Sequence, residues 1–264
     1  MTIAGVRIDK NAKDKEWGFT EASAPRSHRG SDIGVLICHG FGGTPDNMRC
    51  LYDRAVSLGF SAVMPKLTGH GETLGRMNEA NREDWRRDVG AALDSLRSMG
   101  CKRIILSGLS MGALLMADLA EKQAEKGDIA GLIMISPPVR MKRYLRICSA
   151  FSGVMPYVLT NETFESLTTE IYCGMATSRL KEIFRLSRAV TKDIDLISVP
   201  TLIVEAENDD RVDPVSYDML TQRLPSAEYC LIRGAKHGIT YCPQKYELCD
   251  KFEEFLTRIA NKEK

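Results

Sequence analysis

Residues 103–120 read RIILSGLSMGALLMADLA, and they carry the strongest local signal in the chain. The apolar, β-branched run 103–107 is typical of a buried strand. Residues 113–120 are strong helix formers and predict a buried helix. Between the two lies the pentapeptide GLSMG, residues 108–112, which has the pattern Gly-x-Ser-x-Gly. A strand, this pentapeptide and a helix, in that order, are the context of a nucleophile elbow, a sharp turn that presents a serine hydroxyl above a sheet.

The two glycines of the pentapeptide fit the tightness of such a turn. Side chains at Gly108 and Gly112 would collide there, and glycine has no Cβ to do so. Ser110 is expected in a strained backbone conformation that pushes its hydroxyl over the sheet edge. Met111 then offers a backbone N–H at a helix start, where partial positive charge accumulates. Because two glycines around a serine also occur by chance, the assignment depends on partner residues elsewhere in the chain.

The composition is that of an ordinary globular protein, and the 264 residues suit one α/β domain with an insertion. Lys and Arg number 36 against 35 Asp and Glu, which gives no support for nucleic-acid binding. No apolar run is long enough for a membrane span, and residues 1–10 lack the apolar core of a signal peptide. The eight cysteines form no close pair of metal or redox type. We therefore expect a cytoplasmic protein with reduced thiols and no stable membrane insertion.

Short apolar strands and amphipathic helices alternate along most of the chain. Strands are expected at residues 33–38, 60–65, 103–107, 131–135, 201–206 and 228–232. Helices are expected at about residues 45–58, at 83–98, after residue 112, from residue 214 and before the C-terminus. Residues 1–30 are expected to supply one or two short antiparallel strands. This alternation predicts an α/β fold, with a mostly parallel central sheet flanked by helices.

The alternation is interrupted between residues 139 and 195. This stretch contains no strand-like run, and its nine Lys or Arg exceed its six acids. It leaves the carboxyl end of a strand, where ligands bind in such sheets, so we interpret it as a helical cap over an active site. The core is then residues 1–138 and 196–264, and the cap insertion is residues 139–195.

A serine hydroxyl is a poor nucleophile until a base takes its proton, and histidine has a suitable pKa. The chain has four histidines: His28, His39, His70 and His237. His237 comes directly after the last predicted strand. That position puts it at the carboxyl edge of the sheet, on the same rim as Ser110. We therefore predict that His237 is the base.

The imidazole in turn needs a carboxylate that fixes its tautomer and stabilises the imidazolium. The loop after the strand 201–206 offers several acids, of which Asp209 comes first after the turn and is our choice. The neighbouring Asp210 stays open on these grounds alone, since one residue reverses the direction of a side chain. With Asp209 the order along the chain is Ser, Asp, His, which is the order for a nucleophile elbow on such a sheet.

A tetrahedral intermediate also needs N–H donors aimed at its oxyanion. One predicted donor is the N–H of Met111. The second is expected from the loop after the strand 33–38, which contains Gly-Phe-Gly-Gly at residues 40–43. Phe41 is the predicted donor, because its glycine neighbours allow close backbone approach. A glycine-rich turn is more often only a turn, but this one follows a strand expected beside the elbow.

Together these motifs resemble the α/β-hydrolase superfamily, and within it the bacterial carboxylesterase and monoacylglycerol lipase group. The resemblance runs from about residue 32 to residue 259, except for the cap. It rests on HGFGGTP at residues 39–45, GHG at residues 69–71, GLSMG at residues 108–112, Asp209 with Val212 and Pro214, and Gly234-x-x-His237.

The resemblance implies the α/β-hydrolase fold, a Ser110–Asp209–His237 triad and an oxyanion hole from the N–H groups of Phe41 and Met111. It favours Asp209 over Asp210, because the acid of the family sits three residues before a valine. It also implies that the other two loop histidines, at positions 39 and 70, shape loops rather than act as the base.

The predicted activity is that of a serine carboxylic-ester hydrolase working through an acyl-enzyme. Its partner would be a small-molecule acyl ester of short to medium chain length, monoacylglycerols included. No metal or organic cofactor is implied, because nucleophile and base are both side chains. Alternatives with the same triad are an acyl thioesterase, a carbon–carbon bond hydrolase and an amidase. A non-catalytic ligand-binding module on this scaffold is a further alternative, but it would have no need of a complete triad.

The cap allows two interpretations of its side chains. Its apolar residues form either an acyl pocket or the cap's own small core: Phe151, Met155, Tyr157, Val158, Leu159, Tyr172, Met175 and Phe184. Its basic cluster is either a solvated helix face or a surface for an anionic substrate such as an acyl-coenzyme A thioester: Arg140, Lys142, Arg143 and Arg146.

Overall fold

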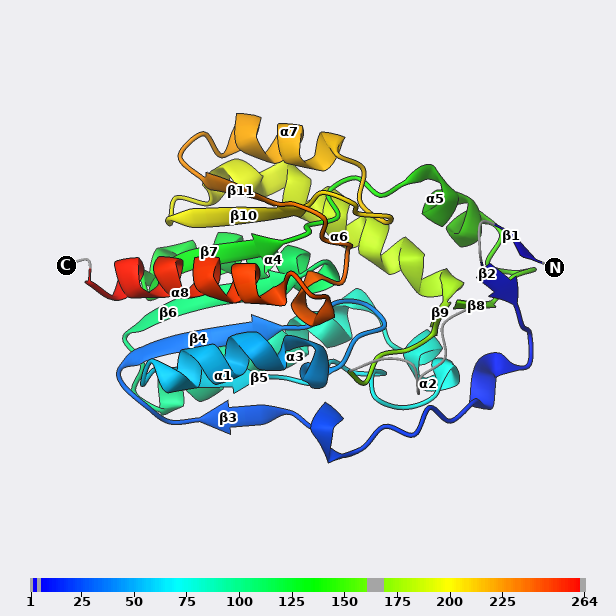
Figure 1. Ribbon diagram of the computed structural model, residues 1–264, viewed down its shortest axis with the longest axis horizontal. Helices are drawn as coiled ribbons and strands as arrows, with labels where there is room; N and C mark the ends of the chain where they lie inside the picture. The colour runs from blue at the N-terminus through cyan, green and yellow to red at the C-terminus, as the bar shows by residue number, and fades with distance from the viewer. Residues whose placement is uncertain (1, 4–5, 161–168, 262–264) are drawn as a thin grey trace.

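The computed structural model describes residues 2–3, 6–160 and 169–261, and a seven-stranded sheet runs through its centre (Figure 1). The strands are, in spatial order, β11 (Glu228–Ile232), β10 (Thr201–Ala206), β7 (Ile129–Ile135), β6 (Arg103–Leu109), β4 (Ile33–Cys38), β5 (Ser61–Met64) and β3 (Arg26–His28). Neighbouring strands are parallel, except that β3 is antiparallel to β5. The predicted mostly parallel sheet is therefore confirmed.

Helices cover both faces of this sheet. The described residues form the helices α1 (Arg49–Ser57), α2 (Leu74–Glu79), α3 (Arg82–Ser98), α4 (Met111–Gln123), α5 (Arg143–Ala150), α6 (Leu180–Asp193), α7 (Val215–Arg223) and α8 (Lys245–Asn261), of which α2 and α5 lie toward the carboxyl edge of the sheet and do not cover its faces. Short 3-10 helices are η1 (Ala12–Asp14), η2 (Glu21–Ser23), η3 (Pro45–Met48), η4 (Ala124–Lys126), η6 (Thr177–Arg179), η7 (Ile194–Leu196) and η8 (Ile239–Tyr241). In Figure 1, α1 and α8 lie in front of the sheet, and α3 and α4 lie behind it. Of the helices in the described residues, none combines the length and apolar character that crossing a membrane requires.

The core consists of two apolar layers, one on each face of the sheet. Alternate residues of a strand enter opposite layers: Val35 packs in the layer of α1 and α8, and Leu36 packs in the layer of α3 and α4. Trp85 of α3 and Phe252 of α8 are among the largest side chains that are fully buried. Full burial of a side chain of this kind contributes about 1.5–3 kcal/mol. Because both faces are covered, the inner strands β4, β6, β7 and β10 are nearly continuous apolar runs.

A second, smaller sheet lies beside the carboxyl ends of the parallel strands (Figure 1). Its order is β1 (Thr2–Ile3), β2 (Val6–Ile8), β8 (Tyr157–Thr160) and β9 (Gly174–Ala176), and all its pairs are antiparallel. The expectation of no strand within residues 139–195 is therefore wrong. β8 is four residues long and its partner β2 lies near the N-terminus, so little local signal marks it.

Residues 1–30 supply three short strands rather than one or two. β1, β2 and β3 all form antiparallel pairs, as expected. β2 pairs with β8 of the segment 139–195, and β1 pairs with β2, so backbone hydrogen bonds join this segment to residues 6–8. The division into a core and a cap insertion at residues 139–195 stays a prediction.

Candidate active site

Ser110 lies in the sharp turn between β6 and α4. Its backbone has φ 55° and ψ −120°, a conformation that non-glycine residues rarely adopt. The turn is held from both sides: the N–H of Ser110 donates to the carbonyl of Ile135 at 2.8 Å, and its carbonyl accepts from the N–H of Ala113 at 2.9 Å. A strained backbone conformation of this kind persists only where surrounding contacts fix it, and such conformations are frequent at functional sites.

The glycines on either side of Ser110 are required by neighbouring backbone. A Cβ on Gly108 would lie 2.3 Å from the carbonyl carbon of Gly112. A Cβ on Gly112 would lie 2.4 Å from the carbonyl oxygen of Cys38, at the end of β4. Both obstacles are main-chain atoms, so no side-chain rotation relieves them. The pentapeptide is therefore needed for the close approach of β4, β6 and α4.

His237 follows β11 and lies on the same rim of the sheet as Ser110. Its Nε2 is 2.9 Å from the Oγ of Ser110, and its Nδ1 is 2.8 Å from the Oδ2 of Asp209. A carboxylate only accepts hydrogen bonds, so Nδ1 carries the proton and Nε2 is left to accept from the serine hydroxyl. The structure thus brings the three predicted residues together, and their catalytic roles stay a prediction.

Asp209 is fixed in the turn after β10. Its Oδ1 accepts hydrogen bonds from the N–H groups of Arg211 and Val212, both at 2.8 Å. Burial by itself raises the pKa of Asp209, but the charge of His237, its hydrogen bond and these two N–H groups lower that pKa overall. Asp210, the alternative acid, has an exposed side chain. Asp209, and not Asp210, contacts the imidazole.

The other two loop histidines are buried behind the site. His39 accepts at Nε2 from the N–H of Leu67 at 3.1 Å and donates from Nδ1 to the carbonyl of Gly40 at 2.9 Å. Burial lowers the pKa of His39 to about 4 and that of His70 to about 3. Both are therefore neutral near pH 7, and their rings lie edge to face, 5.0 Å apart. Neither is hydrogen-bonded to Ser110 among the described residues, and their role in shaping the loops stays a prediction.

The two predicted oxyanion donors lie on either side of Ser110. Met111 is the first residue of α4, so its N–H has no carbonyl partner within the helix. Phe41 follows β4 in a turn closed by the hydrogen bond from Gly43 N–H to Gly40 carbonyl, 3.0 Å long. Phe41 lines the same cavity as Ser110. Their role as donors to an oxyanion stays a prediction.

A narrow cavity of about 30 Å³ lies at Ser110. It is lined by Phe41, Ser110, Pro138, Met141, Leu145, Met175, Leu180, Ile183, Arg211 and His237. This volume holds about one or two water molecules and no ester. Entry of a substrate therefore needs side chains such as Met141 and Met175 to rotate, or α5 and α6 to shift.

Of the eight apolar residues predicted for the acyl pocket or the cap core, Met175 lines this cavity. Tyr157, Leu159 and Tyr172 belong instead to a small apolar cluster with Trp17. Sequence reasoning missed further lining residues, and no motif marks them: Pro138, Met141, Leu145, Leu180, Ile183 and Arg211. The apolar spacing of residues 180 and 183 on one helix face was the available signal.

Two residues of the predicted basic cluster contact the loop that contains Asp209. The ammonium of Lys142 donates to the backbone carbonyl of Asp209. Arg140 forms an ion pair with Asp213, 3.5 Å between Nε and Oδ2. These contacts tie the start of the segment 139–195 to the loop that carries Asp209. The cluster is thus partly structural.

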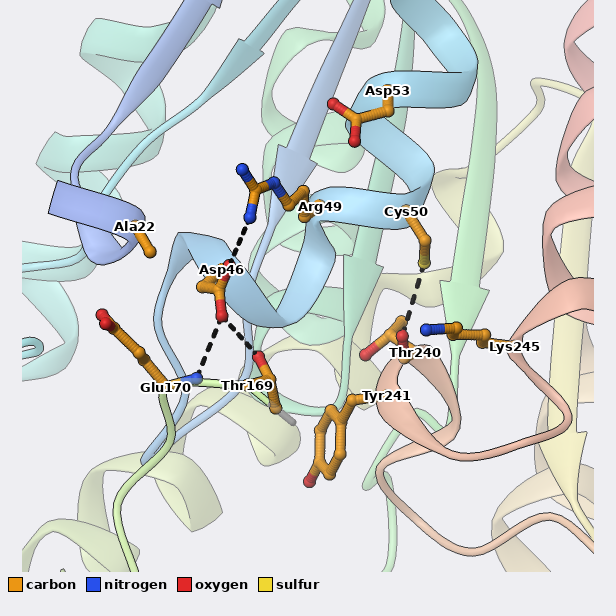
Figure 2. A pocket seen from close by; sticks show the side chains of 10 residues that line it. All are labelled: Ala22, Asp46, Arg49, Cys50, Asp53, Thr169, Glu170, Thr240, Tyr241 and Lys245. Atoms are coloured by element: carbon orange, nitrogen blue, oxygen red, sulfur yellow. Dashed lines mark hydrogen bonds and ion pairs between the residues drawn. The ribbon is translucent and has the colours of Figure 1, made fainter. Parts of the chain in front are cut away.

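A larger and more polar hollow, of about 460 Å³, lies apart from Ser110 (Figure 2). Asp46 is its centre: its Oδ2 accepts from the Oγ1 of Thr169 at 2.9 Å and from the N–H of Glu170 at 3.0 Å. Arg49, which forms an ion pair with Asp46, and Lys245 also line it. None of the predicted site residues lines it. Among the described residues, no three His, Cys, Asp or Glu side chains gather where they would hold a metal ion.

Comparison with known proteins places the chain among hydrolases. A family model described as serine aminopeptidase, S33, matches residues 31–173. The chain is 29% identical over 252 residues to a thermostable monoacylglycerol lipase of Bacillus sp. (strain H-257), covering 93% of this chain and 99% of that protein. It is 26% identical over 247 residues to a carboxylesterase of Bacillus subtilis (strain 168), covering 89% and 96%.

Solved structures share the fold. A structure described under LipS and LipT, two metagenome-derived lipolytic enzymes, superposes with a TM-score of 0.81 at 24% identity, covering 90% of this chain and 98% of that one. The monoacylglycerol lipase of Paleococcus ferrophilus has a TM-score of 0.74 at 16% identity, with 89% and 98% covered. At these identities the likeness concerns the fold alone.

Proposed function

Because this chain belongs to the family described as serine aminopeptidase, S33, and has the α/β-hydrolase fold, we propose that it hydrolyses carboxylic esters with Ser110 as nucleophile. The name of the family model refers to peptidases. The two curated relatives, a monoacylglycerol lipase and a carboxylesterase, match this chain over nearly their full length. They favour ester hydrolysis over peptide hydrolysis.

One observation carries the proposal: the continuous hydrogen-bonded line from the Oγ of Ser110 through the imidazole of His237 to the carboxylate of Asp209. The imidazole accepts from the hydroxyl on one side and donates to the carboxylate on the other. All three side chains are contributed by loops at the carboxyl ends of β6, β10 and β11. Such a line has the geometry by which a serine hydroxyl is activated.

In the proposed reaction, the Oγ of Ser110 attacks the ester carbonyl while Nε2 of His237 takes the hydroxyl proton. The charge of Asp209 stabilises the imidazolium that forms. The imidazolium then gives its proton to the departing alcohol, which leaves an acyl-enzyme on Ser110. Water attacks that acyl group with His237 again as base, and release of the carboxylic acid restores the hydroxyl.

The negative charge on the tetrahedral intermediate falls between two backbone N–H groups, those of Phe41 and Met111. Donors of this kind act in a cavity with little water, where each contributes about 3–4 kcal/mol of transition-state stabilisation. Met111 adds the field of the α4 N-terminus. Because both donors are main-chain groups, their positions depend on the tight packing at the elbow.

We propose that residues 139–195 act as a cap and that the substrate is a short- to medium-chain acyl ester. The cavity wall is apolar over most of its surface, which suits an acyl chain. Met141 and Met175 both line it, and methionine side chains adapt to ligands of varied shape. A monoacylglycerol belongs to this substrate class.

The test is the hydrolysis of p-nitrophenyl butyrate by Ser110→Ala, which should fall to the level of the uncatalysed reaction. Ser107→Ala is the matched control, since it removes a buried hydroxyl from the same strand. Among the described residues, that hydroxyl has no hydrogen-bond partner, so its removal should leave turnover unchanged. Labelling by a fluorophosphonate should disappear in Ser110→Ala and persist in Ser107→Ala. Undiminished turnover in Ser110→Ala would end the proposal.

A further inference from the structure

Arg211 is the cationic side chain in the wall of the cavity that contains Ser110 and His237. The residue is partly buried. Within the described part of the chain, its guanidinium has no hydrogen bond and no ion pair. Two other partly buried arginines differ in this respect: Arg86 pairs with Asp118, and Arg97 pairs with Asp128.

The backbone of Arg211 is held firmly although its charge is not paired. Its N–H donates to the Oδ1 of Asp209 at 2.8 Å, and its carbonyl accepts from the N–H of Lys142 at 2.9 Å. Arg211 therefore bridges the loop of the proposed catalytic acid and the start of the segment 139–195. This anchoring places the guanidinium at the boundary between core and cap.

Among the described groups near the guanidinium of Arg211, no carboxylate pairs with it. The groups that face it are Asp209, Asp210, Tyr144 and Tyr241. The carboxylate of Asp209 already accepts from His237 and from two backbone N–H groups. Asp210 is exposed, and within the described residues no ion pair joins it to Arg211. The cavity wall elsewhere is mostly apolar, where an unpaired charge is costly.

We propose that Arg211 binds an anionic group of the substrate, so that the preferred ester carries a carboxylate a few bonds from its scissile carbonyl. This inference rests on the proposed function and narrows its substrate class. Arginine suits the task because its planar guanidinium pairs with a carboxylate through two parallel hydrogen bonds. A monoacylglycerol, whose glycerol part is neutral, leaves this charge unpaired. The inferred substrate of this chain therefore differs from a monoacylglycerol, the substrate in the name of its relative from Bacillus sp. (strain H-257).

The experiment compares three esters on the wild-type protein and on Arg211→Met. Mono-p-nitrophenyl glutarate carries its carboxylate on the acyl part, 4-butyryloxybenzoate carries it on the leaving group, and p-nitrophenyl butyrate is neutral. The readout is the ratio of kcat/KM for each anionic ester to kcat/KM for the neutral ester. Loss of a charge-assisted hydrogen bond lowers this ratio about 10- to 100-fold. The ester for which the ratio falls identifies the part of the substrate that meets Arg211.

Arg188→Met is the matched control, because it removes an exposed guanidinium from α6 outside the cavity. The ratio should stay at its wild-type value in this variant. Arg211→Lys keeps the charge but not the planar geometry, so it should restore the ratio in part. An equal fall of kcat/KM for all three esters in Arg211→Met would show a structural role and overturn the inference, as would an unchanged ratio.

Calorimetry on the Ser110→Ala protein tests the anion site without turnover. Monomethyl glutarate should bind this protein at least about 10-fold more tightly than methyl butyrate, and Arg211→Met in the same background should remove the difference. Equal binding of the two esters would overturn the inference even if the wild-type protein hydrolyses esters. A wild-type protein that cleaves none of the three esters but keeps the binding difference would contradict the proposed function alone.

Discussion

The carboxyl edge of the large sheet and the segment 139–195 hold their residues in place by different contacts. At the edge, Ser110, Asp209 and His237 each follow a strand of the large sheet within a few positions, and main-chain atoms fix the turn at Ser110. Ser110, for example, is enclosed by the backbones of β7 and α4. In the segment 139–195, β8 depends on a strand from the chain's beginning, and α6 packs through apolar side chains. In the proposed function, the edge supplies the reacting groups, and the segment 139–195 shapes the space above them.

Replacement of the base should have the largest effect on activity. His237→Gln cannot accept the proton of Ser110, so kcat/KM for p-nitrophenyl butyrate should fall about 10⁶-fold. Thermal unfolding should show a folded protein. His28→Gln, in the edge strand β3, removes a histidine far from the site and should keep wild-type activity. A His237→Gln protein with more than one hundredth of the wild-type rate would contradict the assignment of the edge as the site of chemistry.

The acid should come next, and its neighbour supplies the control. Asp209→Asn leaves the shape of the loop nearly intact but favours the wrong imidazole tautomer, so kcat should fall about 10⁴-fold. Asp210→Asn changes an exposed side chain one residue away and should alter kcat less than threefold. Steady-state kinetics on both variants decide between the two acids. The reverse order of effects would mean that the loop rearranges in solution.

Sequence reasoning was most reliable where contacts are local. The strands β4 and β10 begin and end where they were expected, at residues 33–38 and 201–206, because a strand buried on both faces is a continuous apolar run. The positions of His237 and Asp209 followed from the rule that parallel strands end at one edge. Both are loop residues placed by the strands before them.

The same reasoning failed where contacts are distant. β8 and β9 are short strands, and β8 pairs with β9 on one side and with β2 on the other. Strands this short have no clear hydrophobic periodicity in the local sequence that would predict them. Arg211 was passed over as part of an acidic loop, since its exposure to the cavity depends on how α5 and α6 pack. Residues whose position depends on tertiary packing were thus beyond sequence reasoning.

Replacing one glycine by alanine in each region should change the free energy of unfolding by different amounts. In Gly108→Ala, the new Cβ meets the backbone of Gly112 at 2.3 Å, so the free energy of unfolding should fall by about 1–3 kcal/mol. In Gly153→Ala, within the segment 139–195, the new Cβ meets nothing within 4 Å, and the change should stay within about 0.5 kcal/mol. Urea denaturation of both variants provides the comparison. Equal losses would contradict the view that main-chain crowding makes Gly108 less tolerant of a side chain than Gly153.

The smallest predicted effect lies where α4 of the core meets the end of α6. Burial, Asp118 and Asp193 raise the pKa of Glu121 from 4.5 to about 8. Between these two values the folded state binds more protons than the unfolded state, so stability falls as the pH rises through this window. Glu121→Gln has no carboxylate to ionise. It should be about 1–2 kcal/mol more stable than the wild type at pH 9, and nearly equal to it at pH 5.

Urea denaturation at both pH values measures this difference, with the exposed Glu125→Gln as the control that should change stability by less than about 0.5 kcal/mol. Asp193 is the last residue of α6 and so belongs to the segment 139–195. Removing its charge in Asp193→Asn lowers the pKa of Glu121, because a like charge nearby is lost. The gain from Glu121→Gln at pH 9 should then be smaller in that background than in the wild type. Equal gains in the two backgrounds would mean that the end of α6 stands away from α4 in solution, and that the two regions are not coupled through this pair of acids.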